Sequence, residues 1–408
     1  MKSNNAIRRL ASLGVVLAFV VGSLAPSATD VIAQSRRTPP TAPQKKNTRP
    51  SEGEQKTDEQ PQEPIPGDVL KEDPTDTVKI TAALVNVETV VYHKKTGKII
   101  TGLKKENFSI YEDGAQKEIT NFSTPEAPIT VSVVMEYSRL TSFLGSANTF
   151  EQGQNEVLRP MAMFLSQFIK PPDDYVSVIA YDMRPTPLTD FTNDPARISQ
   201  VINLLLRNQP AFTETNLYDA LKLVLVGGKA DSVVLEDHKA EKMEYAGMAS
   251  LQGRRKAVFL ISSGIDTFSK VNYGAARKIA QNAGVPIYII GTGNMFFKRY
   301  EHRLPETDTL GGVPGRLTLL QAQNALRTFA KETGGEYFPV THQGELPSTL
   351  QSINALMRNQ YSLGYKPGGA TDGKQRKILV KVDVDGDGQT DEKEFVIKHR
   401  PFYNPPKG

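Results

Sequence analysis

The chain has 408 residues, a formal net charge of +4 and no cysteine. This length suffices for two or three domains. The small charge, without a basic face interleaved with aromatic residues, argues against a nucleic-acid partner. The lack of cysteine excludes disulfides and lipidation at a lipobox, so stability must come from core burial or bound ions.

The first residues have the features of an export signal. Basic residues precede an apolar run from Leu10 to Leu24, which is short for a hydrocarbon core about 30 Å thick. Small residues follow, and Val31-Ile32-Ala33 offers a cleavage site. We therefore predict a signal peptide over residues 1–33 and a secreted or periplasmic protein. The alternative is an uncleaved membrane anchor, and membrane contact is expected only in that case.

Residues 34–76 are rich in Pro, Gln, Glu, Lys, Ser and Thr, which predicts a disordered linker. Residues 77–125 then predict strands and no helix. The segment from Val78 to His93 alternates in polarity, and two further strand patterns flank Asp113-Gly114. Asp-Gly readily supplies positive φ, so a hairpin turn is expected there.

From residue 126 to residue 345, short apolar strands alternate with amphipathic helices. This order predicts an α/β fold with a doubly wound, mostly parallel sheet covered on both faces. Two polar stretches, Gly227–Gln252 and Met295–Arg316, fit neither pattern and are expected to be surface excursions. Arg254-Arg255-Lys256 is expected to be the solvated start of a strand.

Residues 346–408 predict a last helix, Leu346–Arg358, and a C-terminal β segment of three strands. We expect the N- and C-terminal β segments to form one β-sandwich beside the α/β domain.

Three motifs, in this order of elements, carry a family resemblance: VVMEYSRL (133–140), TETNLYDA (213–220) and LISSGIDTFS (260–269). They resemble the von Willebrand factor A domain. Two flanking segments, GLKKENFSIYEDGAQKEITNF (102–122) and RNQYSLGYKP (358–367), are similar to those of a bacterial secreted subgroup called VWFA-related. The resemblance covers roughly residues 78–408 and implies a Rossmann-like fold with an adhesion or assembly role.

The family's metal-ion-dependent adhesion site takes its ligands from three loops at the carboxyl ends of parallel strands. A hard cation such as Mg²⁺ needs about six oxygens, with one or two carboxylates among them. Carried onto this chain, the ligand positions fall on Glu136, Ser138, Leu140, Thr215 and Ser263. One acid is therefore lengthened, one acid is lost and one hydroxyl is lost.

We accordingly expect a degenerate site in which the hydroxyls of Ser138, Thr215 and Ser263 bond to one another and to the backbone. Glu136 is expected to pair with Arg139 or another cation, and Mg²⁺ is not expected to bind. Metal binding through water, or through Asp266, is the alternative.

Residues 383–394 read DVDGDGQTDEKE and match an EF-hand calcium loop, including its turn glycine, Gly388. Strand patterns flank the loop where an EF-hand has helices, and the alternative is a solvated hairpin turn. Ca²⁺ is the cofactor that this spacing favours. Its ligand positions are Asp383, Asp385, Asp387, Gln389 (through its carbonyl), Asp391 and Glu394.

No phosphate loop, nucleophile elbow or HExxH helix is evident. The sequence therefore favours a non-enzymatic, secreted protein-binding or adhesion module with an unidentified protein partner. The alternatives are a structural cell-envelope scaffold whose C-terminal β hairpin binds calcium, and a hydrolase without a recognisable motif.

Overall fold

A computed structural model describes residues 84–140, 150–231, 242–251, 254–309, 313–368 and 372–405. The predicted signal peptide, the predicted linker and residues 77–83 lie outside the described residues. Among the helices that the structure describes, none is long and apolar enough to cross a membrane.

A six-stranded sheet forms the centre of the α/β domain, with the order β12-β11-β10-β5-β6-β7. Every residue of β5 is buried, as expected for a parallel strand covered on both faces. The sheet is parallel except at β7, which pairs antiparallel with β6. Its strands are β5 (Ile129–Glu136), β6 (Tyr175–Tyr181), β7 (Pro185–Thr192), β10 (Arg255–Ser262), β11 (Ile287–Gly291) and β12 (Tyr337–Pro339).

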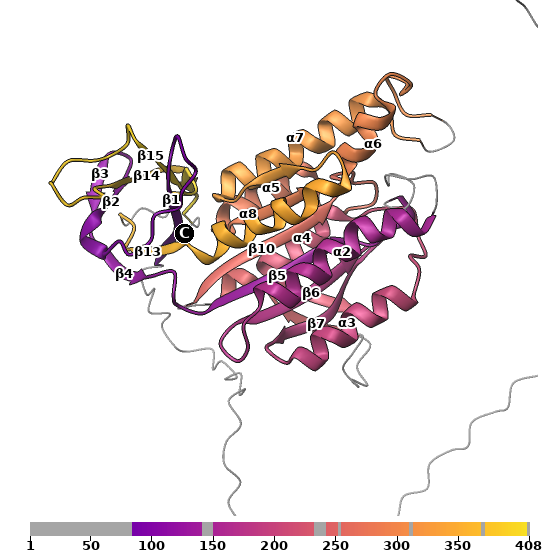
Figure 1. Cartoon of the computed structure of the whole chain (residues 1–408), viewed down its shortest axis with the longest axis horizontal. Coiled ribbons are helices and arrows are strands. Elements are labelled where there is room, and N and C mark those ends of the chain that lie inside the picture. Colours follow the sequence, from indigo (N-terminus) through magenta and orange to yellow (C-terminus); the bar gives the residue numbers. More distant parts are fainter. Residues whose placement is uncertain are drawn as a thin grey trace, which may run out of the picture. The chain divides into compact units, whose positions relative to one another are not determined.

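Helices cover both faces of this sheet (Figure 1). One apolar cluster joins the sheet to α2, α3 and α8, and a second joins it to α4, α5 and α7. The doubly wound α/β fold predicted from the sequence is therefore confirmed. The helices are α2 (Phe150–Phe168), α3 (Pro195–Arg207), α4 (Leu217–Val226), α5 (Tyr273–Ala283), α7 (Arg316–Thr333) and α8 (Leu346–Arg358).

Helix α8 belongs to the α/β core by its contacts. Leu346, Leu350, Ile353 and Met357 are buried in the same cluster as residues of α2 and β5. The sequence grouped this helix with the C-terminal strands, whereas its apolar face packs on the central sheet.

The expectation that Gly227–Gln252 is a surface excursion is wrong where the stretch is described. It contains a hairpin of β8 (Gly227–Asp231) and β9 (Lys242–Ala246), followed by the short helix η2 (Met248–Ser250). Tyr245 is buried with its hydroxyl 2.7 Å from Ser177 Oγ, and Met248 is fully buried. Apolar residues in a polar stretch thus attach it to the core.

The expectation for Met295–Arg316 is wrong only at the start of the stretch, because residues 298–309 are exposed or half-buried. The stretch begins inside α6 (Gly293–Tyr300). Met295, Phe296 and Phe297 are buried, and the two phenylalanines pack with residues of α7.

The flanking β segments form two four-stranded sheets, β15-β1-β13-β4 and β16-β14-β2-β3. Each sheet combines strands from both ends of the chain, and their buried residues form one apolar cluster, so the predicted sandwich is confirmed. The predicted hairpin turn has φ of 48° at Asp113 and 87° at Gly114. The strands are β1 (Val85–His93), β2 (Phe108–Glu112), β3 (Ala115–Lys117), β4 (Ile119–Ser123), β13 (Tyr361–Tyr365), β14 (Arg376–Val382), β15 (Phe395–Lys398) and β16 (Phe402–Tyr403).

Arg255, at the start of β10, joins the two chain crossings between the sandwich and the α/β domain. The side chain is only 1% exposed. Its guanidinium donates to the carbonyls of Pro125 (2.7 Å) and Ala127 (3.0 Å) on one crossing, and of Arg358 (2.9 Å) and Gln360 (3.2 Å) on the other.

Lys256 is also buried, and its Nζ donates to the carbonyls of Met248 (3.0 Å) and Leu251 (2.8 Å). The expectation of a solvated strand start is therefore wrong for Arg255 and Lys256. Both side chains thus have backbone carbonyls as hydrogen-bond partners, as buried cations require.

Candidate functional site

Three loops meet at the carboxyl edge of the central sheet. They follow β5 (residues 137–140), precede α4 (208–216) and follow β10 (263–272). The amide of Arg139 donates to Phe212 O (2.7 Å), and the amides of Thr267 and Phe268 donate to Thr215 O (2.9 and 3.0 Å). The loop before α4 is thus fixed to both of its neighbours by backbone hydrogen bonds.

The carboxylate of Glu136 lies at the base of these loops and is fully buried. Its Oε2 accepts hydrogen bonds from Ser263 N (2.7 Å), Ser263 Oγ (2.8 Å) and Ser262 Oγ (3.3 Å). Its Oε1 accepts from Ser138 Oγ at 3.3 Å. Protein donors thus surround the group that would have to ligate a metal, as a buried carboxylate requires.

Tyr181 and Ser262 complete this cluster and were not identified from the sequence. The Tyr181 hydroxyl donates to Ser262 Oγ (2.8 Å) and lies 3.5 Å from Glu136 Oε2. Burial, together with the carboxylates of Glu136 and Asp266, raises the pKa of Tyr181 well above its usual value. The phenol is therefore a neutral donor. Tyr181 could have been predicted to lie near Glu136 from its position at the end of the strand next to β5.

Thr215 contacts the backbone of the next loop. Its Oγ1 donates to Ile265 O (2.8 Å), and its amide donates to Thr267 Oγ1 (2.9 Å). Of the four site residues predicted from the sequence, the structure thus brings Glu136, Ser138 and Ser263 into direct contact, and Thr215 holds two of the loops together.

Leu140 explains why a hydroxyl is missing from the family pattern. The side chain is 5% exposed and packs in a cluster with Ile265, Phe296 and Leu319. An apolar residue at this position extends the core to the edge of the sheet. Arg139 beside it is exposed, and its Nε donates to Pro210 O at 3.2 Å.

Asp266 faces the start of α4. Its Oδ1 accepts from Ser269 Oγ (2.5 Å) and from the amide of Tyr218 (3.3 Å). Burial is the largest influence on this carboxyl and raises its pKa. The same amide also donates to Ser269 Oγ at 3.0 Å, so Asp266 and Ser269 together cap the helix N-terminus.

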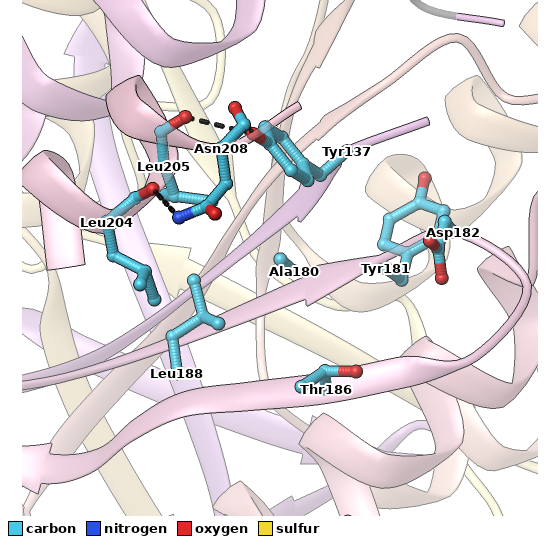
Figure 2. A pocket seen from close by; sticks show the side chains of 9 residues that line it. All are labelled: Tyr137, Ala180, Tyr181, Asp182, Thr186, Leu188, Leu204, Leu205 and Asn208. Carbon is cyan, nitrogen blue, oxygen red and sulfur yellow. Dashed lines mark hydrogen bonds between the residues drawn. The ribbon is translucent and has the colours of Figure 1, made fainter. Parts of the chain in front are cut away.

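A pocket of about 290 Å³ lies beside the cluster, between the carboxyl ends of β5 and β6, the start of β7 and the end of α3 (Figure 2). The Tyr137 hydroxyl donates to Leu205 O at 2.9 Å and closes one side. Burial raises the pKa of Tyr137 to about 12, so this donor is neutral. The lining is Tyr137, Ala180, Tyr181, Asp182, Thr186, Leu188, Leu204, Leu205 and Asn208.

Two phenylalanines are exposed on the loops at this edge. Phe212 is 40% exposed and Phe268 is 52% exposed. Their backbones take part in the hydrogen bonds that join the three loops. The edge therefore presents large apolar side chains on a fixed backbone.

The predicted calcium loop, between β14 and β15, places three of its acids close together. Ligand oxygens of Asp383, Asp385 and Asp391 lie within 4.8 Å of one another, in the one such group among the described residues. Both Asp383 oxygens accept backbone amides, from Gly386 (2.7 Å) and Gly388 (2.8 Å).

The other predicted ligands of the loop, Asp387, Gln389 and Glu394, are not part of this cluster of three aspartates. Asp387 Oδ1 accepts the amide of Gln389 at 2.7 Å, and the backbone of Glu394 donates to Asp391 O at 3.1 Å. The loop thus has a partly assembled set of hard oxygen ligands, of the kind that Ca²⁺ uses.

No protein-family model and no curated protein matches this chain. Among solved structures, it is similar to an aerotolerance-related membrane protein from Bacteroides fragilis (15% identity, 56% of this chain and 98% of that chain, TM-score 0.35). It is also similar to the vWF domain of the type V pili tip protein Mfa5 from Porphyromonas gingivalis (16% identity, 57% and 95%, TM-score 0.36). A third is proximal thread matrix protein 1 from the mussel byssus with a zinc-occupied MIDAS motif (13% identity, 60% and 49%, TM-score 0.38).

The mostly parallel sheet with helices on both faces is the Rossmann-like architecture that the sequence resemblance implied. The chain thus contains a doubly wound α/β domain flanked by a β-sandwich.

Proposed function

We propose that this chain is an exported, non-enzymatic protein-binding module that holds its partner at the carboxyl edge of the central sheet. The observation that carries the proposal is the pocket of about 290 Å³ at that edge, with Phe212 and Phe268 exposed on the neighbouring loops. Aromatic residues and pockets that receive a buried anchor dominate protein interfaces.

The pocket favours an apolar anchor from the partner. Leu188, Leu204, Leu205 and Ala180 contribute to its lining. Tyr137 OH is already bonded to Leu205 O, and Asn208 Nδ2 donates to Leu204 O at 2.6 Å. Because these polar groups have partners, an aliphatic or aromatic side chain would leave none of them unpaired.

We further propose that binding at this edge does not depend on a divalent metal. Ser263 N, Ser263 Oγ and Ser138 Oγ already donate to the Glu136 carboxylate, so a cation would have to displace them. Position 140, where the family has a hydroxyl ligand, is occupied by Leu140, whose side chain packs in the core.

The test begins with affinity capture from cell-envelope extract in Mg²⁺, in Ca²⁺ and in chelator, followed by measurement of the Kd for the identified and purified partner. Phe212→Ser/Phe268→Ser and the pocket-filling Thr186→Phe should each weaken binding by at least about tenfold. The matched control Leu317→Ser/Leu320→Ser removes two exposed apolar residues of α7 and should leave the Kd within about twofold.

An equal loss of affinity in the control would indicate nonspecific binding to exposed apolar residues. It would contradict the proposal that the partner binds at the carboxyl edge of the sheet. Binding that requires Mg²⁺ and disappears in Glu136→Ala, while the fold is retained, would contradict metal independence.

A second candidate is a structural scaffold of the cell envelope stabilised by Ca²⁺ at the 383–394 loop. The convergence of Asp383, Asp385 and Asp391 favours it. Like-charged carboxylates at such a distance repel one another unless a cation or protons intervene. Capture that is independent of the Phe212 and Phe268 substitutions but requires Ca²⁺ would favour this function.

A further inference from the structure

We propose that the outer face of the sheet β16-β14-β2-β3 binds an acidic polysaccharide that carries a carboxylate on alternate sugars. This site belongs to the sandwich and is separate from the edge of the central sheet that the proposed function uses. It is a hollow of about 310 Å³ lined by Tyr111, Gly114, Lys377, Leu379 and Lys381.

Strand periodicity brings these side chains to one face. Ile378, Val380 and Val382 of β14 are buried, so Lys377, Leu379 and Lys381 point outward. Leu379 is 40% exposed. The two lysines are four residues apart on one strand, a distance of about 13 Å.

Aromatic side chains flank this row. Tyr111 on β2 is directly opposite Leu379, and Phe402 on β16 is opposite Lys377. Lys381 Nζ lies 5.9 Å from the centroid of the Tyr111 ring. The face thus combines apolar surface for the CH face of a sugar ring with ammonium groups at both ends.

Neutral polar residues lie beside the row, and Asp113 lies at its end, where its Oδ1 accepts from the amide of Lys377 at 2.8 Å. Ser109 is opposite Lys381, and Gln116 on β3 is opposite Tyr111. A hydroxyl and an amide at these positions suit the hydroxyl groups of a sugar. Lys381 also lies 3.4 Å from Glu392 Oε1, but both side chains are about a third exposed or more, and such a pair contributes little.

Charge spacing favours a polysaccharide over a nucleic acid. A single-stranded nucleic acid carries a phosphate at every nucleotide and is bound in grooves whose positive charge follows the backbone. Two lysines about 13 Å apart along the strand, separated by an aliphatic residue, give a sparser positive charge, which suits a polymer whose anionic units are separated by neutral ones.

The test measures binding of the full chain to a hyaluronate decasaccharide by isothermal titration calorimetry, with a neutral dextran oligosaccharide and oligo-dT for comparison. We expect hyaluronate to bind and the other two to bind at least about tenfold more weakly. Lys377→Gln/Lys381→Gln should weaken binding at least about tenfold and lower the salt dependence by about two charges. Tyr111→Ala should weaken it without changing the salt dependence.

The control Lys278→Gln/Lys331→Gln removes the same charge from exposed positions on α5 and α7. It should leave the affinity within about twofold, and far-UV circular dichroism of all variants should match the unmodified chain. No binding of hyaluronate, equal or tighter binding of oligo-dT, or equal losses in the control pair would each overturn the proposal.

Discussion

Two sets of carboxylates on this chain occupy opposite surroundings. Glu136 is fully buried, and serine donors and a backbone amide bind both of its oxygens. Asp383, Asp385 and Asp391 lie on a partly exposed loop, with oxygens close to one another. Hydrogen-bond donors fixed in the fold stabilise the carboxylate of Glu136. The three aspartates of the loop instead leave negative charge that a bound cation can balance. A site resembling a metal centre in sequence can therefore be closed by its own side chains.

The largest expected effect is at the closed site. Glu136→Ala should lower the free energy of unfolding by about 3 to 4 kcal/mol, because it leaves several buried donors without an acceptor. Urea denaturation measures this loss. The control Glu214→Ala removes an exposed carboxylate from a neighbouring loop and should change stability by less than about 0.5 kcal/mol. A similar small effect for both variants would mean that the Glu136 hydrogen bonds do not support the fold.

A substitution of Leu140 tests whether apolar packing also stabilises the site around Glu136. Leu140→Ala should cost about 3 kcal/mol, since it opens a cavity against Ile265, Phe296 and Leu319. Leu206→Ala, at an exposed aliphatic residue of α3, is the control and should cost much less. If Leu140→Ala were as mild as the control, the replacement of a hydroxyl by leucine would have no packing explanation.

Glu88 lies between the two extremes, because it is buried with one oxygen bonded to Ser362 Oγ (2.8 Å) and the other without a partner among the described residues. Burial raises its pKa to about 7, against the opposing influence of Ser362, Arg255, Lys256 and Arg400. The folded state therefore favours the protonated acid. The stability that this group contributes is present below its unfolded pKa and is lost as pH rises through about 7.

Glu88→Gln should remove that dependence and stabilise the chain at pH 8 relative to the unmodified protein, by up to about 3 kcal/mol. Urea unfolding of both proteins from pH 5.5 to 8.5 measures the difference between their free energies of unfolding. The contributions of other titrating groups, such as His399, are the same in both proteins and cancel in this difference. Glu106→Gln, at an exposed position, should leave the pH profile unchanged. A difference that does not grow with pH would contradict the proton linkage.

The smallest expected effect is at the open site. For a Kd of about 0.1 mM, 1 mM Ca²⁺ should stabilise the chain by about 1.4 kcal/mol. Thermal unfolding in Ca²⁺ and in chelator measures this, and Asp383→Asn/Asp385→Asn should abolish the shift. Equal midpoints in Ca²⁺ and chelator for the unmodified chain would mean that the loop is a solvated turn.

The sequence predicted those parts of the fold that depend on local patterns. The apolar run of β5 and the Asp113-Gly114 turn are examples, because each needs only neighbouring residues. Strand β7 was not identified, since Pro185 and Pro187 disfavour a central strand, and prolines are tolerated only because β7 is at the edge of the sheet. The helix α6 was obscured by its polar flanks.

The same limit applies to the sites. The positions of Glu136, Ser138 and Ser263 could be predicted because parallel strands end at one edge. Tyr181 as a member of the cluster, and Tyr111 with Lys377 and Lys381 as one surface, depend on strand pairing between distant segments. Nor does any local pattern reveal that Arg255 is buried, because its partners are carbonyls more than a hundred residues away.

The hydrogen bonds of Arg255 have a mechanical consequence. The guanidinium holds both chain crossings between the sandwich and the α/β domain, through carbonyls at 125 and 127 and at 358 and 360. A tensile force that separates the two modules would load both crossings at one point, and the bonds would share it in parallel. Under force, the sandwich and the α/β domain are therefore expected to separate in a single step, once the force exceeds a threshold.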